Sequence, residues 1–313
     1  METLQKLFKT FSDPTRIRIL ALLEREELAV QELMAVLGMA QSRVSRHLAI
    51  LREASLLQVR RDGTSVFYRF ALPSTGPWRE AWELTSRALG EEPGHARDHA
   101  ALAGVLEKRS AKARSFFEKV GPEWDSLRTI FDDDALRARA VARLATPGLR
   151  VADIGTGPGT LAAELCRLGL RVVAIDHSKR MLAAAEANLH AEKLEGVELR
   201  LGEAGNLPLE TAEVDAALAH MVLRYLPSPA EAIREMARVV APGGMVVVVD
   251  FVQHEHEWMR EELGVAWLGF GLEEIASWLR EAGLPDPSIQ VHANTSSGRD
   301  LPDAFIASAR KPG

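Results

Sequence analysis

Residues Val151 to Thr160 read VADIGTGPGT, a stretch in which a strand ends near an acid and runs directly into alternating glycines. Gly155, Gly157 and Gly159 leave backbone N–H groups uncovered where the next helix begins. A helix N-terminus offers unpaired donors and the positive end of the helix dipole, which suits an anionic or polar ligand. We therefore interpret this stretch as the cradle of a nucleotide-like cofactor.

The spacing of this loop disfavours a nicotinamide dinucleotide. The dinucleotide fingerprint has a third glycine where this chain has Thr160. The next apolar strand, in RVVAIDHS, ends at Asp176, and an acid at that place suits the hydroxyl pair of a ribose. The ligand is therefore expected to carry a ribose without being a dinucleotide.

Together these motifs resemble the cofactor site of class I S-adenosylmethionine-dependent methyltransferases, and the turn RVVAPGG before a later apolar strand is similar too. The resemblance covers about Phe116 to Arg310 and implies S-adenosylmethionine as the cofactor and S-adenosylhomocysteine as the product. It assigns the cofactor contacts to Asp153, Gly155, Thr156, Gly157, Gly159, Asp176, His177, Glu203, Ala204 and His220.

Two segments carry groups that suit the transfer step, HMVLRYL after the fourth strand and HEHEW after the fifth. Methyl transfer from a sulfonium is a displacement on an activated carbon, so the protein supplies proximity and, for a poor nucleophile, a base. The catalytic candidates are His220, Tyr225, His254, His256 and Glu257. HEHEW equally fits a solvated helix start, and its His-x-His pair lacks a third ligand of clear spacing. No metal is expected.

The first seventy residues have the pattern of a winged helix-turn-helix. Asp13-Pro14 begins a helix, Gly38 ends a second, and a third with a basic N-terminal half begins near Gln41. Two β-rich stretches, 57–61 and 64–70, flank Asp62-Gly63, which is a strong signal for a two-residue hairpin turn. The third helix is expected to enter a DNA major groove.

The run from Ser12 to Phe70 resembles the ArsR/SmtB family of winged-helix repressors. That resemblance implies a homodimer that binds double-stranded operator DNA and regulates transcription. The family's thiol metal site does not carry over, because Ala29 and Gln31 stand where such sensors have cysteines. The resemblance assigns DNA contacts to Gln41, Ser42, Arg43, Ser45, Arg46, His47, Arg60 and Arg61.

Length and composition are those of an ordinary globular protein with room for two domains, at 313 residues, 47% hydrophobic and 26% charged. The N-terminus lacks the pattern of a secretory signal, and no apolar run is long enough to span a bilayer. The single cysteine, Cys166, fits a reducing compartment. A cytoplasmic protein without a membrane partner is expected.

Strand and helix patterns alternate after residue 149, which predicts an α/β domain following the winged helix. The expected strands are 150–154, 171–176, 197–201, 214–219, 245–249, 288–293 and 304–309. The fold class is a doubly wound, seven-stranded Rossmann-like domain, whose reversed final hairpin rests on the resemblance. We expect a DNA-binding and dimerisation domain over 1–92, a bridging helix over 93–120 and a methyltransferase domain over 121–313.

Two functions remain open at this point. In the first, a working methyltransferase modifies a small-molecule acceptor while its N-terminal domain binds DNA. In the second, the C-terminal domain is catalytically silent, and bound S-adenosylmethionine or S-adenosylhomocysteine controls operator binding by differential affinity. The intact glycine loop and Asp176 support cofactor binding in both cases, and the retained His, Tyr and acid candidates favour the enzyme.

Overall fold

The computed structural model describes residues 2–72, 75–90, 92–120, 134–144, 148–294 and 301–313. They form two compact units, Met1–Lys108 and Arg109–Gly313. The division falls inside the long helix α6 (Pro93–Val120), in the range for which the sequence predicts a bridging helix. Within the described residues, none of the helices combines the length and the apolar character that a membrane span requires.

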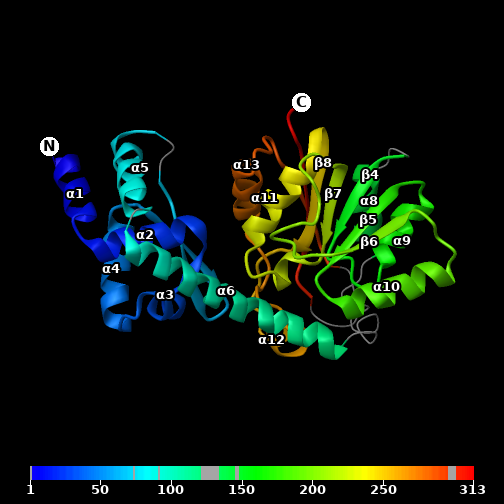
Figure 1. Ribbon diagram of the computed structural model, residues 1–313, viewed down its shortest axis with the longest axis horizontal. Coiled ribbons are helices and arrows are strands. Elements are labelled where there is room, and N and C mark those ends of the chain that lie inside the picture. Colours follow the sequence, from blue (N-terminus) through cyan, green and yellow to red (C-terminus); the bar gives the residue numbers. More distant parts are fainter. Residues whose placement is uncertain (1, 73–74, 91, 121–133, 145–147, 295–300) are drawn as a thin grey trace. The chain divides into compact units, whose positions relative to one another are not determined.

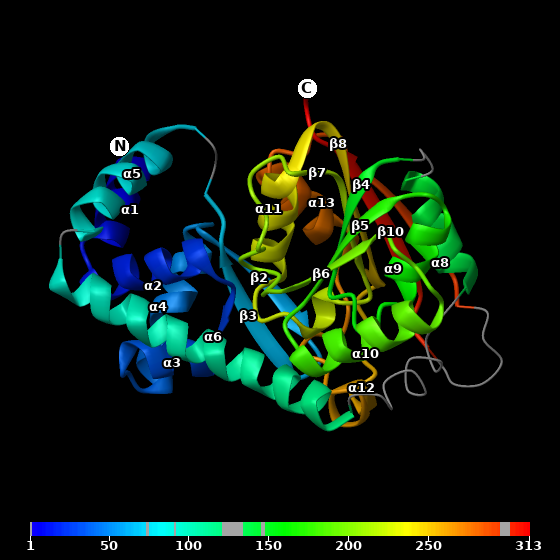
Figure 2. The same cartoon turned by 45° about the vertical axis from the view of Figure 1, so that its right-hand side comes forward.

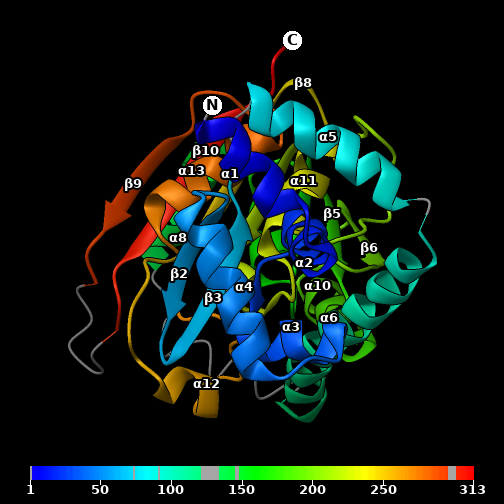
Figure 3. The same ribbon diagram turned by 90° about the vertical axis from the view of Figure 1, so that its left-hand side faces the viewer.

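The first unit packs helices against a small sheet with strand order β1-β3-β2 (Figure 3). One buried apolar cluster joins these helices to part of α6, and Leu33, Leu48 and Trp82 are each at most 1% exposed. Its elements before α6 are α1 (Glu2–Phe11), α2 (Pro14–Arg25), β1 (Leu28–Ala29), α3 (Val30–Leu37), α4 (Gln41–Glu53), β2 (Leu57–Asp62), β3 (Ser65–Phe70) and α5 (Pro77–Gly90).

Helices α3 and α4 form the predicted helix-turn-helix. The carboxylate of Asp13 caps α2 by accepting the backbone N–H groups of Thr15 and Arg16, at 2.8 and 3.2 Å. Gly38 ends α3 with φ of 64°, a left-handed conformation that glycine adopts without a steric penalty. The residues expected from the sequence therefore mark the start of α2 and the end of α3.

The wing is the antiparallel hairpin β2–β3, but its turn differs from the one predicted. Asp62 pairs with Ser65, so the two loop residues are Gly63 and Thr64 rather than Asp62 and Gly63. Asp62 is a fully buried strand residue, whereas Gly63 takes the positive φ of 56° that the turn requires. The dipeptide signal located the hairpin correctly and misplaced its loop by one residue.

The second unit is a seven-stranded sheet with order β6-β5-β4-β7-β8-β10-β9. Neighbours from β6 to β8 are parallel, and β10 runs antiparallel to both β8 and β9, which confirms the reversed hairpin. The strands are β4 (Arg150–Ile154), β5 (Arg171–Asp176), β6 (Val197–Leu201), β7 (Val214–His220), β8 (Val240–Phe251), β9 (Ser288–His292) and β10 (Ala304–Arg310).

Helices cover both faces of this sheet, as a doubly wound fold requires (Figures 1 and 2). Val246 to Val249 of β8 are each 0% exposed, because a parallel sheet between two helical layers buries both of its faces. The helices are α8 (Asp134–Val141), η2 (Ala142–Leu144), α9 (Thr160–Arg167), α10 (Lys179–Ala191), η3 (Leu223–Tyr225), α11 (Pro229–Val239), α12 (Trp258–Glu262) and α13 (Leu272–Glu281).

The order of the central strands decides where a ligand fits. The chain passes from β4 to β5 on one side and reaches β7 on the other side of β4. In such sheets, ligands bind beyond the carboxyl ends of the strands where the strand order reverses. The loops after Ile154, Asp176 and His220 all lie at that edge.

Candidate cofactor pocket and nucleic-acid interface

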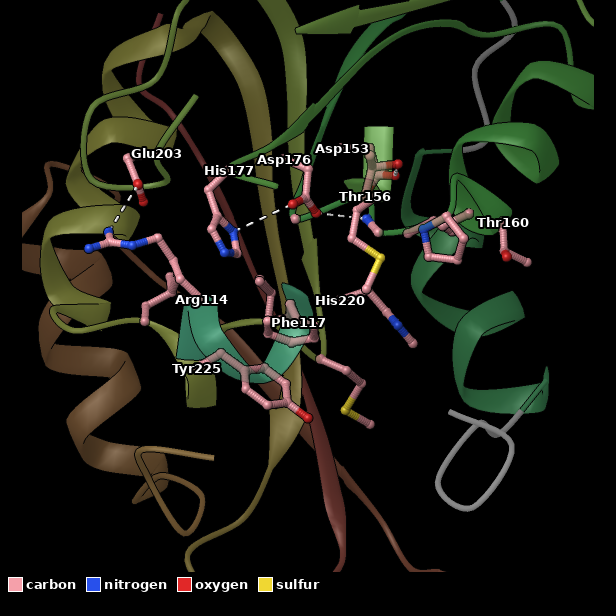
Figure 4. A pocket seen from close by; sticks show the side chains of 18 of the residues that line it. Arg114, Phe117, Asp153, Thr156, Thr160, Asp176, His177, Glu203, His220 and Tyr225 are labelled. Carbon is pink, nitrogen blue, oxygen red and sulfur yellow. Dashed lines mark hydrogen bonds and ion pairs between the residues drawn. The ribbon is translucent and has the colours of Figure 1, made fainter. Parts of the chain in front are cut away.

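A pocket lies at the carboxyl ends of β4, β5 and β7 (Figure 4). Most of the residues that the sequence assigns to the cofactor line it, namely Asp153, Gly155, Thr156, Gly157, Asp176, His177, Glu203 and His220. Gly159 and Ala204 are not among the described lining residues. The strand-end positions therefore converge on one pocket, although they are far apart in the sequence.

The carboxylate of Asp176 ties the glycine loop to the end of β5. One of its oxygens accepts the backbone N–H of Gly157 at 2.9 Å, and the other accepts that of Ser178 at 2.8 Å. The ring of His177 lies beside it, with Nδ1 3.4 Å from the carboxylate. Burial raises the pKa of Asp176, and the nearby His177 charge and the two N–H groups act against this rise.

Asp153 contacts the same loop through Thr156. It is 2% exposed and accepts a hydrogen bond of 2.7 Å from the hydroxyl of Thr156. Burial raises the pKa of Asp153 to about 7, against the lowering effect of the Thr156 hydrogen bond and with a further rise from the Asp176 charge. The folded domain consequently holds this proton at pH values where a free aspartate has lost it.

Two of the glycines are required for different steric reasons. A Cβ on Gly155, whose φ is 70°, would lie 2.3 Å from Cγ2 of Val222, the residue that closes the loop from the β7 side. A Cβ on Gly159 would lie 2.9 Å from Cβ of Ala185 in α10. Gly155 thus lets the loop approach the pocket wall, whereas Gly159 lets α9 begin close to α10.

Several residues of the pocket were not predicted from the sequence. Ser110, Arg114 and Phe117 of α6 line it, and Nη1 of Arg114 lies 3.5 Å from Oε1 of Glu203 (Figure 4). Met221, directly after β7, also lines it with φ of 58°. A positive φ at a non-glycine residue stores backbone strain, which is common at functional sites.

The catalytic candidates are split between two places. His220 and Tyr225 line the pocket, and the Tyr225 ring lies 4.9 Å from that of Phe117 between centroids. His254, His256 and Glu257 are not among its described lining residues. The backbone N–H of His254 instead bonds to Leu268 O at 3.0 Å.

Burial lowers the pKa of His254 to about 3, with further lowering from the charges of His256, Arg224 and Arg260. His254 is therefore a neutral, packed side chain at neutral pH. Among the described residues, no group of three or more His, Cys, Asp or Glu side chains is placed to hold a metal ion.

The pocket has the polar groups that a nucleoside-containing cofactor needs. Nε2 of His177 is buried and has no hydrogen-bond partner within the described part of the chain. A buried polar atom without a partner is costly, so it indicates a missing ligand atom or water. Beside it are the Asp176 carboxylate and the ring of Phe117, whose centroid is 6.0 Å from that of His177. Carboxylate, imidazole and aromatic face together fit a ribose with an attached base.

Helix α4 presents most of the predicted DNA contacts to solvent. Of the predicted contacts, Gln41, Ser42, Arg43, Ser45 and Arg46 are exposed on this helix, and Arg61 of the wing is exposed as well. His47 differs from them, because its side chain is 15% exposed and its Nδ1 lies 3.9 Å from the capping carboxylate of Asp13. The exposed set provides both cationic groups and hydrogen-bonding groups at the start of one helix.

Arg60 is engaged within the protein. Its guanidinium makes hydrogen bonds of 2.9 Å to both carboxylate oxygens of Glu27 and stacks over Phe67 at 5.2 Å from the ring centroid. Its side chain is 12% exposed. Arg60 therefore links the wing to the loop before β1, whereas the side chain of Arg61 is exposed.

Comparisons with known proteins agree with both units. Residues 152–248 match the family described as "Methyltransferase domain", and residues 13–59 match "Bacterial regulatory protein, arsR family". The chain is 33% identical over 203 residues to a demethylmenaquinone methyltransferase of Desulfitobacterium hafniense, covering 59% of this chain and 80% of that protein.

Two more distant similarities point the same way. An arsenite methyltransferase of Halobacterium salinarum is 27% identical over 219 residues, and the chain spans only about half of it, 56%. A solved Burkholderia thailandensis 1,6-didemethyltoxoflavin-N1-methyltransferase, with its substrate and S-adenosylhomocysteine bound, superposes with a TM-score of 0.54. At 21% identity, over 66% of this chain and 90% of that one, this likeness shows the fold.

The second unit is thus a Rossmann-like methyltransferase domain, and the first carries a regulatory helix-turn-helix. The chain belongs to the methyltransferase family, as an enzyme with an ArsR-type DNA-binding domain ahead of its catalytic domain.

Replacing Gly155 with alanine is expected to destabilise the second unit more than the same change at Gly169. Both glycines have positive φ, 70° and 83°, so both variants strain the backbone. Only at Gly155 does the new Cβ also meet a neighbour, and such overpacking costs about 1–3 kcal/mol. Urea unfolding followed by circular dichroism measures the difference. Val222→Ala should recover part of the loss in G155A, and equal destabilisation by G155A and G169A would contradict the steric argument.

Proposed function

We propose that this protein transfers a methyl group from S-adenosylmethionine to a small molecule and binds double-stranded DNA through its first unit. The observation that carries the proposal is the single pocket in which the glycine loop, the Asp176 carboxylate and His220 meet. When bound, the cofactor supplies an activated methyl group. The chain's own residues then have to bind it, orient the acceptor and move a proton where the acceptor requires it.

The geometry of the loop supports the proposed cofactor contacts. Asp176 would take the ribose hydroxyls, since its carboxylate lies at the end of β5 next to the glycine loop. His177, with its unpartnered Nε2, and Phe117 would flank the base. Glu203 and Ala204 follow β6, and Glu203 would contact the edge of the adenine. Gly155 and Gly157 would pack against the methionine part.

The acceptor side of the pocket favours an organic molecule over a metalloid. His220 and Tyr225 line it, and aromatic and apolar groups such as Phe117 and Met221 surround them. Cys166 is the one cysteine of the chain, and it packs against the apolar core of the second unit instead of lining the pocket. The thiolate chemistry of arsenite methylation therefore has no cysteine group here to act through.

The first unit supports DNA binding as a homodimer. Phe8 of α1 and Leu84 of α5 are 68% and 67% exposed, which is unusual for large apolar side chains. Trp82 of the same α5 is 1% exposed and belongs to the unit's own core. A second copy that covers Phe8 and Leu84 would present two α4 helices to a two-fold symmetric operator. A cytoplasmic location is part of this proposal.

Incubation with S-adenosylmethionine carrying a radiolabelled methyl group and a metabolite extract should give labelled small molecules. Asp176→Ala should lose this label together with binding of S-adenosylhomocysteine, measured by calorimetry. Glu198→Ala is the matched control, because Glu198 is an exposed acid on the neighbouring strand β6. Label confined to DNA or protein would contradict a small-molecule acceptor. Tight S-adenosylhomocysteine binding without any labelled product would contradict turnover.

The double variant Arg43→Ala, Arg46→Ala should weaken binding to a random-sequence duplex and flatten its dependence on salt. Each lost phosphate contact removes about one unit from the slope of log affinity against log salt concentration. Arg52→Ala is the control, since Arg52 is an exposed arginine in the last turn of the same helix. Fluorescence anisotropy at several salt concentrations measures both quantities. An equal effect of R52A would contradict recognition by the start of α4.

A ligand-dependent change in DNA affinity is a second candidate function, favoured by helix α6. Leu102 and Val105 of α6 are buried in the core of the first unit, and Asp98 accepts two hydrogen bonds of 2.6 Å from Arg18. Further along, Arg114 and Phe117 line the cofactor pocket. A ligand that contacts Phe117 therefore acts on a helix that also belongs to the DNA-binding unit.

The second candidate is tested by measuring duplex affinity without ligand, with S-adenosylmethionine and with S-adenosylhomocysteine. Differential binding requires the two ligands to change DNA affinity by different factors. Phe117→Leu keeps an apolar residue at the pocket and should reduce the difference. Identical DNA affinity in all three conditions, with both ligands bound, would overturn this second function.

A further inference from the structure

The short helix η3, which carries Tyr225, is hydrogen-bonded to the end of β8 through the buried side chain of Asp250. Asp250 is 0% exposed, and its carboxylate accepts the backbone N–H of Arg224 at 3.2 Å and that of Phe251 at 2.8 Å. A carboxylate buried with such N–H donors is a strong anchor, because leaving either side without its partner is costly. Asp250 thus couples the backbone of η3 to the sheet.

Arg224 completes the anchor from the other side. It is 1% exposed, and its Nη1 lies 3.8 Å from the Asp250 carboxylate, an ion-pair distance longer than a hydrogen bond. Its guanidinium stacks on Phe251 at 4.4 Å and lies 5.5 Å from the Tyr225 ring centroid. The carbonyl of Arg224 accepts the N–H groups of Ala266 and Trp267, at 2.8 and 3.1 Å. One residue therefore joins η3 to β8 and to the segment after α12.

Neither Arg224 nor Asp250 is among the described residues that line the pocket, whereas Tyr225 lines it and is 4% exposed. The Tyr225 ring packs edge-on against Phe117 at 4.9 Å (Figure 4). The other titratable groups of this pocket are Asp153, Asp176, His177, Glu203 and His220, with the guanidinium groups of Arg114 and Arg137. The ion pair of Asp250 and Arg224 therefore influences the pocket through Tyr225, the pocket residue that Arg224 contacts.

We propose that Asp250 and Arg224 are positioning residues that hold the Tyr225 ring in place as part of the pocket wall. This inference rests on the proposed methyl transfer. Burial raises the pKa of Tyr225 to about 12, and the neighbouring Arg224 charge opposes that rise. Tyr225 therefore keeps its proton at neutral pH.

The test uses the full chain labelled with 3-fluorotyrosine and read by fluorine NMR. The chain has two tyrosines, so Tyr68→Phe leaves one signal, that of Tyr225. S-adenosylhomocysteine is the probe, and its affinity is measured separately by calorimetry. In the Y68F background, adding it should shift the Tyr225 signal. Raising the pH should titrate that signal well above the midpoint of free 3-fluorotyrosine.

Asp250→Asn and Arg224→Met should shift or broaden the Tyr225 signal and reduce its response to S-adenosylhomocysteine. Arg224→Lys should give an intermediate signal. The matched controls are Glu235→Gln and Arg238→Lys. Glu235 also accepts a loop N–H, that of Leu207 at 2.9 Å, and also pairs with an arginine, Arg238, but neither residue lines the pocket. Both controls should keep the parent signal.

Four outcomes are distinguishable. An unchanged Tyr225 signal in D250N and R224M, with the probe bound, overturns the positioning role. A titration at or below the midpoint of free 3-fluorotyrosine contradicts a buried Tyr225 ring and overturns its place in the pocket wall. If D250N and R224M fail to fold by circular dichroism, R224K decides, because a signal identical to that of R238K overturns the proposal and a distinct one supports it. Absence of probe binding in the Y68F parent would instead contradict the proposed cofactor.

Discussion

The carboxylate of Asp176 is the interaction on which the pocket depends. It ends β5 and accepts the backbone N–H groups of Gly157 and Ser178, so one side chain orients the glycine loop and the start of the next helix. The same loop also needs glycine at position 155, where a Cβ would lie 2.3 Å from Cγ2 of Val222. Strand order then brings His220 to the same edge. These polar residues meet at one edge because the parallel strands that carry them end there together.

Buried charge is concentrated at this edge of the sheet. Asp153, Asp176 and Asp250 are all nearly inaccessible to water, and burial raises the pKa of each. Each carboxylate is stabilised by backbone N–H groups, a hydroxyl or a guanidinium. Such groups are expensive to bury and contribute little net stability, so their concentration beside one pocket is better explained by geometry that binding requires.

The sequence predicted the parts of the site that local pattern determines. Period and turn chemistry located seven strands, although β8 begins at Val240, before the turn that the sequence predicted ahead of Met245. The acid at the end of β5 was recognised because it follows an apolar run. Arg114 and Phe117 were missed, because the apolar face of a helix does not say which pocket it closes. HEHEW stays a prediction. Its residue types suit catalysis, but its residues are not among the described residues that line the pocket.

Arg60 and Arg61 show the same limit in the first unit. Both are adjacent arginines on a predicted wing, and alternation along a strand already sends neighbouring side chains to opposite faces. Which face holds a partner depends on Glu27, a residue distant in sequence that pairs with Arg60. A bidentate pair at 12% exposure commits Arg60 to the protein, whereas the side chain of Arg61 is exposed. DNA contact by this hairpin is therefore expected through one of the two arginines.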